Sequence, residues 1–330
     1  MSAGTSSPKR SVRWRLAIAL FLLLAGLFIL LLLGERWAEF RRLEAEIREF
    51  HWDVRAGWLA AALLLATANL FWMAKIWVRL FRATGGVIRG GEGVRVWVIT
   101  NMGRYIPGKL WQLGGLALYM RRTGRSGTAA LFSSLAFQIL VVGTGIAVGL
   151  SVLGLRFELL PAGSGAGVAI LAAALLALLH PAVLQRATGA AARWMREDVA
   201  VKRLGGRELA AAGASLLAAW ALYGLGLWCL LRGLTGDAQA APQTLTGIFA
   251  AAYVAGYVVL VAPGGLVVRE GALAGLLAAL TPLSLGVAAA VAVLARIWVV
   301  ASELLALALV ALPVDRRRPT EGPSPGLGRG

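Results

Sequence analysis

The sequence predicts an all-α polytopic membrane protein with about six full spans and two broken, re-entrant helical hairpins. Its residues are 59% hydrophobic and only 15% charged, and its mean hydropathy is +0.75. Soluble domains are usually nearer half apolar and about a quarter charged. A third observation is a pair of Pro-Gly breaks inside long apolar regions. The sequence contains no polar stretch long enough for a soluble catalytic domain.

Charge and composition divide the chain into a membrane domain and two tails. Residues 1–15 are polar and basic, residues 16–313 are mostly apolar, and residues 314–330 are rich in Pro, Gly and Arg. The formal net charge is +17. Lys and Arg beside apolar spans mark cytoplasmic loops, which argues against a nucleic-acid partner. We therefore expect a multi-pass membrane protein with two cytoplasmic tails, of which the C-terminal one is disordered.

Apolar runs between charged turns give the individual spans. We expect full crossings at residues 16–33, 58–78, 128–153, 167–184, 209–231 and 286–312. Within the third, Gly145 and Gly149 form a small-xxx-small face for close helix packing. Residues 35–55 alternate acidic and basic side chains, with apolar ones at helical spacing. This pattern predicts an amphipathic helix on the outer interface, with a surface for substrate entry as the alternative.

The first break lies at residues 101–112, which read NMGRYIPGKLWQ. Basic residues lie on both sides of it, including Arg82 before and Arg121 after. Both flanks are therefore cytoplasmic by the charge rule. A segment that enters and leaves on one face is a re-entrant hairpin or an interfacial helix pair rather than a crossing.

The last third of the chain admits more than one topology. Residues 244–261 and 272–280 are apolar and flank the second break, and Arg316, Arg317 and Arg318 mark a cytoplasmic tail. If 244–261 crossed alone, the last span would end outside. If both segments crossed, one of about ten residues would have to cover about 30 Å. We favour a hairpin that enters from outside, because the tail then lies inside.

Two hairpins entering from opposite faces are typical of an inverted repeat, whose broken helices meet at a substrate site. Proline removes a backbone donor, and the half-helix that follows presents a positive dipole end to anions. In the first break, cationic, aromatic and amide side chains would contact a phosphate and its hydroxyl groups. The candidate substrate-binding residues there are Arg104, Tyr105, Pro107, Gly108, Lys109, Trp111 and Gln112.

The second hairpin and the last span contain isolated intramembrane charges, which are costly unless paired or functional. The candidate substrate-binding residues of this break are Pro263, Gly264, Gly265, Arg269 and Glu270. Arg296 and Glu303 are supporting charges, seven residues apart and so near one helix face. The alternative is that these four charges pair with one another as internal structural contacts.

Residues that would support other chemistry are scarce. Cys229 is the only cysteine, and the two histidines are far apart, so we expect no metal site and no cofactor. Gly103 to Lys109 fits G-x-x-x-x-G-K, but Leu110 stands where a nucleotide-binding loop needs Ser or Thr. No catalytic residue is assigned, and the sequence favours a transporter over an enzyme.

The motif Arg104 to Gln112, followed far downstream by Pro263-Gly264-Gly265 and Arg269-Glu270, resembles the lysylphosphatidylglycerol synthase transmembrane-region family. Members are flippase-like integral membrane proteins, also described as an uncharacterised integral membrane family. The resemblance covers nearly the whole chain. It implies a bacterial inner-membrane protein that handles lipid headgroups, with residues 16–313 as the flippase-like domain. The soluble aminoacyl-transferase domain of the full-length synthases is absent, which argues against lysine transfer.

These observations favour a flippase or translocator for an anionic or modified phospholipid or glycolipid headgroup. The alternative is a membrane-embedded transferase, for which Glu270 and Glu303 are the visible acid-base candidates, or an accessory subunit or scaffold in lipid or lipid-linked glycan biosynthesis. The expected partners are membrane lipids with anionic headgroups and lipid-biosynthetic enzymes, and a homo-oligomer is left open.

Overall fold

The structure is a computed structural model, and it describes residues 37–105, 110–153, 201–258 and 267–312. These residues form helices joined by short connections, and no β-strand occurs among them. The predicted all-α fold is therefore confirmed. The predicted spans 16–33 and 167–184 and both predicted tails lie outside the described residues.

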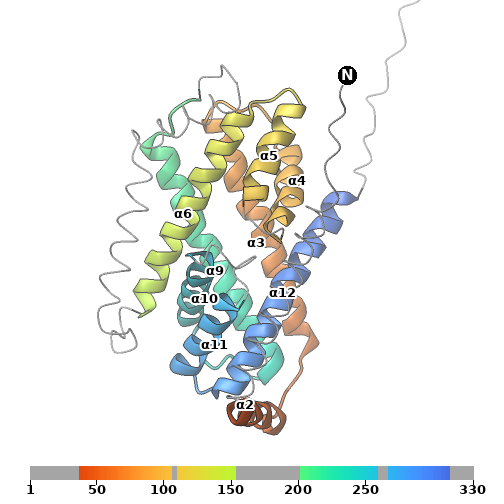
Figure 1. The fold of residues 1–330 in the computed structure, drawn as a ribbon, viewed down its shortest axis with the longest axis vertical. Helices are drawn as coiled ribbons and strands as arrows, with labels where there is room; N and C mark the ends of the chain where they lie inside the picture. The colour runs from red at the N-terminus through yellow and green to blue at the C-terminus, as the bar shows by residue number, and fades with distance from the viewer. Residues whose placement is uncertain (1–36, 106–109, 154–200, 259–266, 313–330) are drawn as a thin grey trace, which may run out of the picture.

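Four long helices form the body of the molecule (Figure 1). They are α3 (Ala56–Ala83), α6 (Gly127–Leu153), α9 (Gly206–Thr235) and α12 (Leu285–Ala311). A helix of this length is about 40 Å long, enough to cross a hydrocarbon core of about 30 Å. All four are also apolar enough to span a membrane. They coincide with the spans predicted at 58–78, 128–153, 209–231 and 286–312.

Helices α3 and α9 run antiparallel and define the two ends of the molecule. The amide of Arg55 donates to the carbonyl of Gly233 at 2.9 Å, which joins the start of α3 to the end of α9. The amide of Lys202 donates to the carbonyl of Thr84 at 3.1 Å, which joins the end of α3 to the start of α9. We refer to these as the Arg55 end and the Thr84 end.

The first hairpin consists of α4 (Gly90–Asn101), the 3₁₀ turn η1 (Met102–Tyr105) and α5 (Leu110–Arg122). It starts just after α3 and finishes just before α6, so both its outer ends lie at the Thr84 end (Figure 1). Neither α4 nor α5 is long enough to cross a membrane, because each measures about 20 Å. The hairpin therefore enters and leaves on one side, as the sequence predicted.

The second hairpin consists of α10 (Pro242–Val258) and α11 (Val268–Leu280). Short connections join it to the end of α9 and the start of α12, so both its outer ends lie at the Arg55 end (Figure 1). This is the hairpin topology favoured from the sequence, and it replaces the alternatives in which residues 244–261 cross. The tip of the hairpin, with Pro263, Gly264 and Gly265, lies outside the described residues.

The described helices form two sets with the same order and opposite direction. The first is α3, α4, α5 and α6, and the second is α9, α10, α11 and α12. Equivalent contacts recur in the two sets: α5 packs on α6 as α11 packs on α12, and α6 contacts α10 as α12 contacts α4. The arrangement matches the predicted inverted repeat, with α3 and α9 packed together at its centre.

The amphipathic helix α2 (Trp37–Glu49) lies at the Arg55 end, beneath the start of α12 (Figure 1). The Glu46 carboxylate accepts a 2.8 Å hydrogen bond from the backbone N–H of Gly286 in the first turn of α12. This bond and one to Ser284 lower the pKa of Glu46. The helix predicted for residues 35–55 is thus confirmed, and its interfacial position remains a prediction.

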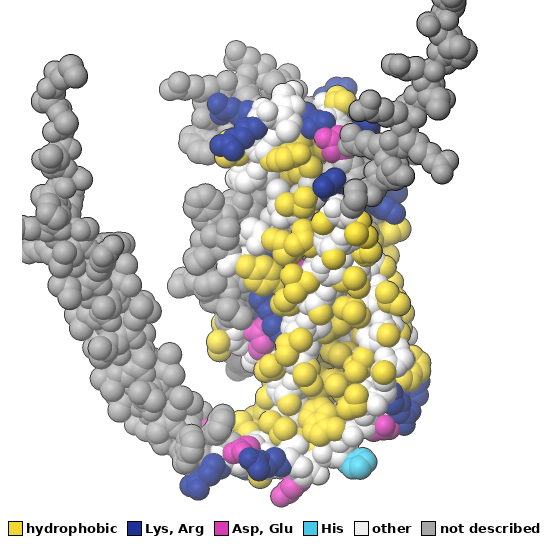
Figure 2. All heavy atoms as spheres, turned by 90° about the vertical axis from the view of Figure 1, so that its right-hand side faces the viewer, with side chains coloured by type: hydrophobic (Ala, Val, Ile, Leu, Met, Phe, Trp, Pro, Cys, Tyr) yellow, Lys and Arg dark blue, Asp and Glu magenta, His cyan; other side chains and the backbone are white. Residues whose placement is uncertain are grey.

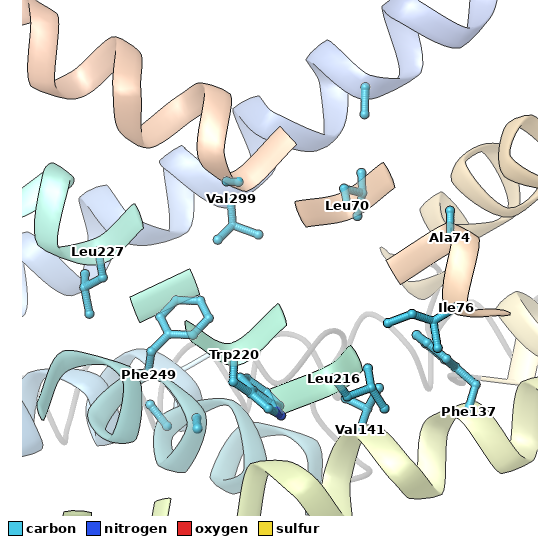
Figure 3. Close-up of a cluster of buried hydrophobic side chains, with 14 of the residues drawn as sticks. Leu70, Ala74, Ile76, Phe137, Val141, Leu216, Trp220, Leu227, Phe249 and Val299 are labelled. Atoms are coloured by element: carbon cyan, nitrogen blue, oxygen red, sulfur yellow. The ribbon is translucent and has the colours of Figure 1, made fainter. Parts of the chain in front are cut away.

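Apolar side chains from the helices of both sets form a continuous core. Figure 3 shows residues of α3, α6, α9, α10 and α12 converging on it, among them Leu70, Val141, Trp220 and Phe249. On α6, a Cβ at Gly149 would lie 3.2 Å from the Cβ of Ala251, so α6 and α10 approach closely where the small-xxx-small face was predicted.

The outer surface between the two ends is apolar. Figure 2 shows hydrophobic side chains over the middle of the face in view, with Lys and Arg gathered mostly toward the ends. Leu64, Val293, Ile297 and Leu304 are among the exposed large hydrophobic residues on the spanning helices. Because a soluble protein rarely exposes so continuous an apolar surface, this distribution fits a protein surrounded by lipid.

Candidate functional site

The two hairpins meet the long helices at a central cavity of about 90 Å³. Its volume corresponds to about three water molecules. Every helix of the two sets except α5 contributes to its wall. The cavity is lined by Leu70, Met73, Trp97, Asn101, Arg104, Tyr105, Phe137, Gln138, Tyr223, Tyr253, Gly256, Tyr257, Arg269, Arg296 and Val299.

The first hairpin contacts α12 through a partly buried cluster of an arginine, a tyrosine and a glutamate. Helix α4 ends in the 3₁₀ turn, which brings Arg104 and Tyr105 beside Glu303. Tyr105 Oη donates to Glu303 Oε2 at 2.6 Å, and the Arg104 guanidinium forms an ion pair with Glu303 Oε1. The Glu303 side chain is only 1% exposed. A carboxylate so buried is stable only when its charge is paired and hydrogen-bonded, and Arg104 and Tyr105 satisfy both needs.

The second hairpin contacts α12 through another ion pair. Arg296 Nη1 lies 3.6 Å from Glu270 Oε1, and the two side chains are 15% and 17% exposed. Glu270 lies in the first turn of α11, where the helix dipole also favours a negative charge. On α12, Arg296 pairs with the second hairpin and Glu303 pairs with the first. These two residues are two helical turns apart.

Arg269 has a different environment from the other two arginines. Its guanidinium carbon lies 4.9 Å from the ring centre of Phe249 and 5.6 Å from that of Tyr253, within the range of cation–π contacts. No carboxylate in the described part of the chain pairs with it. Gly256 of α10 permits this position, because a Cβ there would lie 2.6 Å from the Cβ of Arg269.

The charges around the cavity do not balance. Arg104, Arg269 and Arg296 line it, and the carboxylates paired with them are those of Glu270 and Glu303. Among the described residues this cluster therefore has one positive charge in excess. In a partly dehydrated space an unbalanced charge is costly, so the cavity is suited to a singly charged anion.

Several polar lining residues were not found from the sequence. Gln138 Nε2 is buried without a hydrogen-bond partner among the described residues, and Asn101, Tyr223, Tyr253 and Tyr257 also line the cavity. Two signals were present: Gln138 is an isolated amide in an apolar span, and Tyr253 and Tyr257 lie one helical turn apart in another. These groups add hydrogen-bond donors and flat apolar surfaces to the arginines.

The site residues predicted from the sequence have different outcomes. Arg104, Tyr105, Arg269 and Arg296 meet at the cavity, and Glu270 and Glu303 pair with these arginines. The alternative that the four late charges pair only among themselves holds for Arg296 and Glu270, whereas Glu303 pairs with the first hairpin.

The remaining predicted site residues stay predictions. Trp111 and Gln112 belong to α5, and their side chains lie outside the described part of the structure. The others, which also lie outside it, are Pro107, Gly108, Lys109, Pro263, Gly264 and Gly265.

The fold and the apolar surface define a multi-pass membrane protein. Residues 11–306 match the family model described as the lysylphosphatidylglycerol synthase TM region. Because the match covers most of the chain, the protein belongs to this family, as the sequence motifs indicated, and it is an integral membrane protein related to lipids. No curated protein and no solved structure gives a significant match.

Proposed function

We propose that this protein binds the phosphate-bearing headgroup of an anionic lipid in the central cavity and translocates it across the membrane. The observation that carries the proposal is Arg269, which pairs with no carboxylate of the described residues, in a cavity whose described residues have one excess positive charge. A phosphodiester carries one negative charge and would balance the cluster. Guanidinium groups also match the geometry of phosphate oxygens better than ammonium groups do.

The two hairpins supply a path for such a headgroup. One enters from the Thr84 end and the other from the Arg55 end, and the cavity lies between them. In transporters with inverted repeats, movement of one set of helices relative to the other exposes a central site alternately to each side. The headgroup would pass through the polar cavity while its acyl chains stay in the surrounding lipid.

The charge balance also favours some lipids over others. A lysylated headgroup carries an ammonium group, which would need a carboxylate. Glu270 and Glu303 are both held by arginines, and a second cation would add to the existing excess. We therefore propose that a phosphodiester headgroup without an amine is a better substrate than a lysylated one.

The same pairing argues against the transferase alternative. A general acid or base must be free to contact the substrate atom whose proton it transfers, whereas Glu270 and Glu303 are each engaged by an arginine. Neither Glu270 nor Glu303 is suited to that role while paired. An accessory role beside lipid-biosynthetic enzymes is the outcome to expect if the purified protein moves no lipid.

We further propose that the Thr84 end is cytoplasmic in a bacterial inner membrane. Lys75, Arg79, Arg82, Arg121 and Arg122 lie near this end, on α3 and α5. Cytoplasmic loops carry an excess of such residues. Cysteine-accessibility labelling of an Asp237→Cys variant, which marks the opposite end, should react from the outside, and labelling only after permeabilisation would reverse the proposed orientation.

Translocation is tested with purified protein in liposomes that contain fluorescent phosphatidylglycerol. In vesicles with wild-type protein, the fluorescent lipid of the inner leaflet should become accessible to an external quencher much faster than it does in protein-free vesicles. Arg269→Gln should slow this at least about tenfold, because a charge-assisted phosphate contact is worth more than 1.4 kcal/mol. A fluorescent lysylated analogue should also move more slowly.

Arg232→Gln is the matched control. Arg232 is a partly buried arginine stacked over the rings of Trp58 and Trp228, outside the cavity. Its substitution should leave lipid movement unchanged. Wild-type protein that moves no lipid, or an Arg269→Gln variant as active as wild type, would overturn the proposed function.

A further inference from the structure

A second cavity, of about 280 Å³, lies between α3 and α9 near the Thr84 end. It shares no residue with the central cavity. It lies between the two helices that join the two sets of the repeat. Its walls are formed by Ile76, Arg79, Leu80, Arg207, Glu208, Ala211, Ala212 and Ser215. We call it the α3–α9 pocket.

The polar side of this pocket carries an excess of positive charge. Arg79 comes from α3 and Arg207 from the first turn of α9, and both are exposed. Glu208 also lines the pocket, yet it forms no ion pair with either arginine. Among the residues that the structure describes, two guanidiniums and one carboxylate leave one positive charge for an anion.

The other side of the pocket is apolar. Ile76, Leu80 and Ala212 are buried, and Ile76 and Ala212 lie nearer the middle of their helices than the arginines do. Below them, the indole N–H of Trp72 donates to the carbonyl of Ser215 at 3.0 Å, which links α3 to α9 at the base of the pocket. Cations near the helix ends and an apolar surface toward the middle match an amphiphile with its headgroup at the membrane surface.

We infer that the α3–α9 pocket binds one anionic phospholipid, with its phosphate between Arg79 and Arg207 and its first acyl carbons against Ile76 and Ala212. Basic pockets between spanning helices are a known kind of site for anionic headgroups. Free inorganic phosphate would use the two arginines but not the apolar wall. A bound lipid would connect α3 to α9 and so stabilise the contact between the two halves.

The test is to count bound lipids by native mass spectrometry of the full-length protein in neutral detergent with added phosphatidylglycerol. Arg79→Gln/Arg207→Gln should lose one tightly bound lipid, with at least a tenfold weaker apparent affinity. Arg203→Gln is the matched control, because Arg203 is an exposed cation one turn before Arg207 that does not line the pocket. It should keep that lipid. Both substitutions are at exposed positions, and thermal unfolding without lipid should confirm that both proteins fold.

Several outcomes would overturn the inference. The lipid could remain on the double variant, phosphatidylcholine could bind equally well, or inorganic phosphate could displace the phospholipid. Arg269→Gln separates this inference from the proposed function, because it removes the central charge and should leave the α3–α9 pocket occupied. If wild-type protein moves no lipid but the Arg79→Gln/Arg207→Gln variant still loses one bound lipid, the inference about the α3–α9 pocket holds and the function proposed for the central cavity fails.

Discussion

In the first hairpin, Arg104 pairs with a Glu303 side chain that is 1% exposed, and Tyr105 hydrogen-bonds the same carboxylate. In the second, Glu270 and Arg296 lie 3.6 Å apart, and their side chains are 17% and 15% exposed. In the first contact the carboxylate is buried and both hydrogen-bonded and ion-paired, although Arg104 itself is 26% exposed. In the second the ion pair is longer, and the two Glu270 oxygens are buried without a hydrogen bond from any described residue. The difference indicates that the ionic contact of the first hairpin with α12 is the stronger of the two.

The backbones of the two hairpins also differ: that of the first is regular beside its contact with α12, and that of the second is strained. The first turns through a short 3₁₀ segment that holds Arg104 and Tyr105 side by side. In the second hairpin, α11 begins directly after Val267. The φ of Val267 is 73°, a value that a β-branched residue rarely adopts. Such a conformation costs energy and occurs at ligand sites and switches. If one of the two ionic contacts with α12 opens during transport, the one between Glu270 and Arg296 is the better candidate.

The largest expected effect comes from breaking the contact of Glu303 with the first hairpin. Glu303→Gln should destabilise the protein by up to about 3 kcal/mol, because it leaves the partly buried Arg104 without its counter-ion. Equilibrium unfolding in mixed detergent micelles measures this change. The double variant Glu303→Gln/Arg104→Gln should recover much of the loss, because no charge is then left unpaired. A double variant as unstable as the sum of the two single variants would show that the ion pair is not what holds the first hairpin.

A smaller effect on stability is expected at Gly256, where α10 approaches Arg269 of α11 closely. Gly256→Ala should cost about 1–3 kcal/mol through overpacking, since the added Cβ would lie 2.6 Å from the Cβ of Arg269. It should also slow lipid movement. Gly275→Ala in α11 is the control, because a Cβ there meets nothing within 4 Å. That change should leave stability equal or higher, since alanine favours helix.

Breaking the contact between Glu270 and Arg296 should have a still smaller effect on stability. Glu270→Gln should change the unfolding free energy by about 1 kcal/mol or less, because the cost of burying a carboxylate that accepts no hydrogen bond from a described residue offsets much of the gain from the ion pair. It also removes one negative charge, so the binding of anionic lipid should tighten, as measured by titration with phosphatidylglycerol. A loss of stability as large as that of Glu303→Gln would remove the proposed difference between the hairpins.

The smallest effect concerns α2, which contacts α12 beside the outer end of the second hairpin. The pKa of Glu46 is lowered by its bonds to Gly286 and Ser284, so these bonds favour the docked helix above the ordinary pKa of a glutamate. This contribution should be lost as pH falls through that value and below it. The protection of the Gly286 amide against hydrogen exchange, relative to its intrinsic rate at the same pH, should therefore fall below about pH 4. Glu46→Gln should exchange faster already at pH 7 and should show a weaker dependence on pH.

The sequence alone gave much of the architecture, and particular residues explain why. The apolar runs that became α3, α6, α9 and α12 are long enough to be recognised by composition, because each must cover the hydrocarbon core. Basic residues beside the first break and the charge parity of the last third indicated both hairpins. The isolated Arg269 and Glu270 indicated a site, because charge is rare within spans.

The residues that complete the cavity were harder to predict. Asn101, Tyr223 and Tyr253 occur among many polar and aromatic side chains of apolar helices, and only the crossing of those helices determines which of them face inward. Gln138 was noticeable as an isolated amide, but its neighbours were not. The seven-residue spacing of Arg296 and Glu303 also suggested a pair on one helix. Instead, Glu303 pairs with Arg104 of the first hairpin and Arg296 pairs with Glu270 of the second. The Arg296 guanidinium carbon also lies 5.7 Å from the ring centre of Tyr105 in the first hairpin.

The sequence by itself determined that this is a membrane protein with two broken hairpins, since helix length, proline position and loop charge are local properties of the chain. The tertiary structure decided which charges compensate one another. Tyr105 and Glu303 are 198 positions apart, and their contact exists because α12 runs past the tip of the first hairpin. Pairing of buried charges depends on distances between helices. Only the folded structure could therefore show that Arg269 is the arginine of the central cavity left without a carboxylate among the described residues.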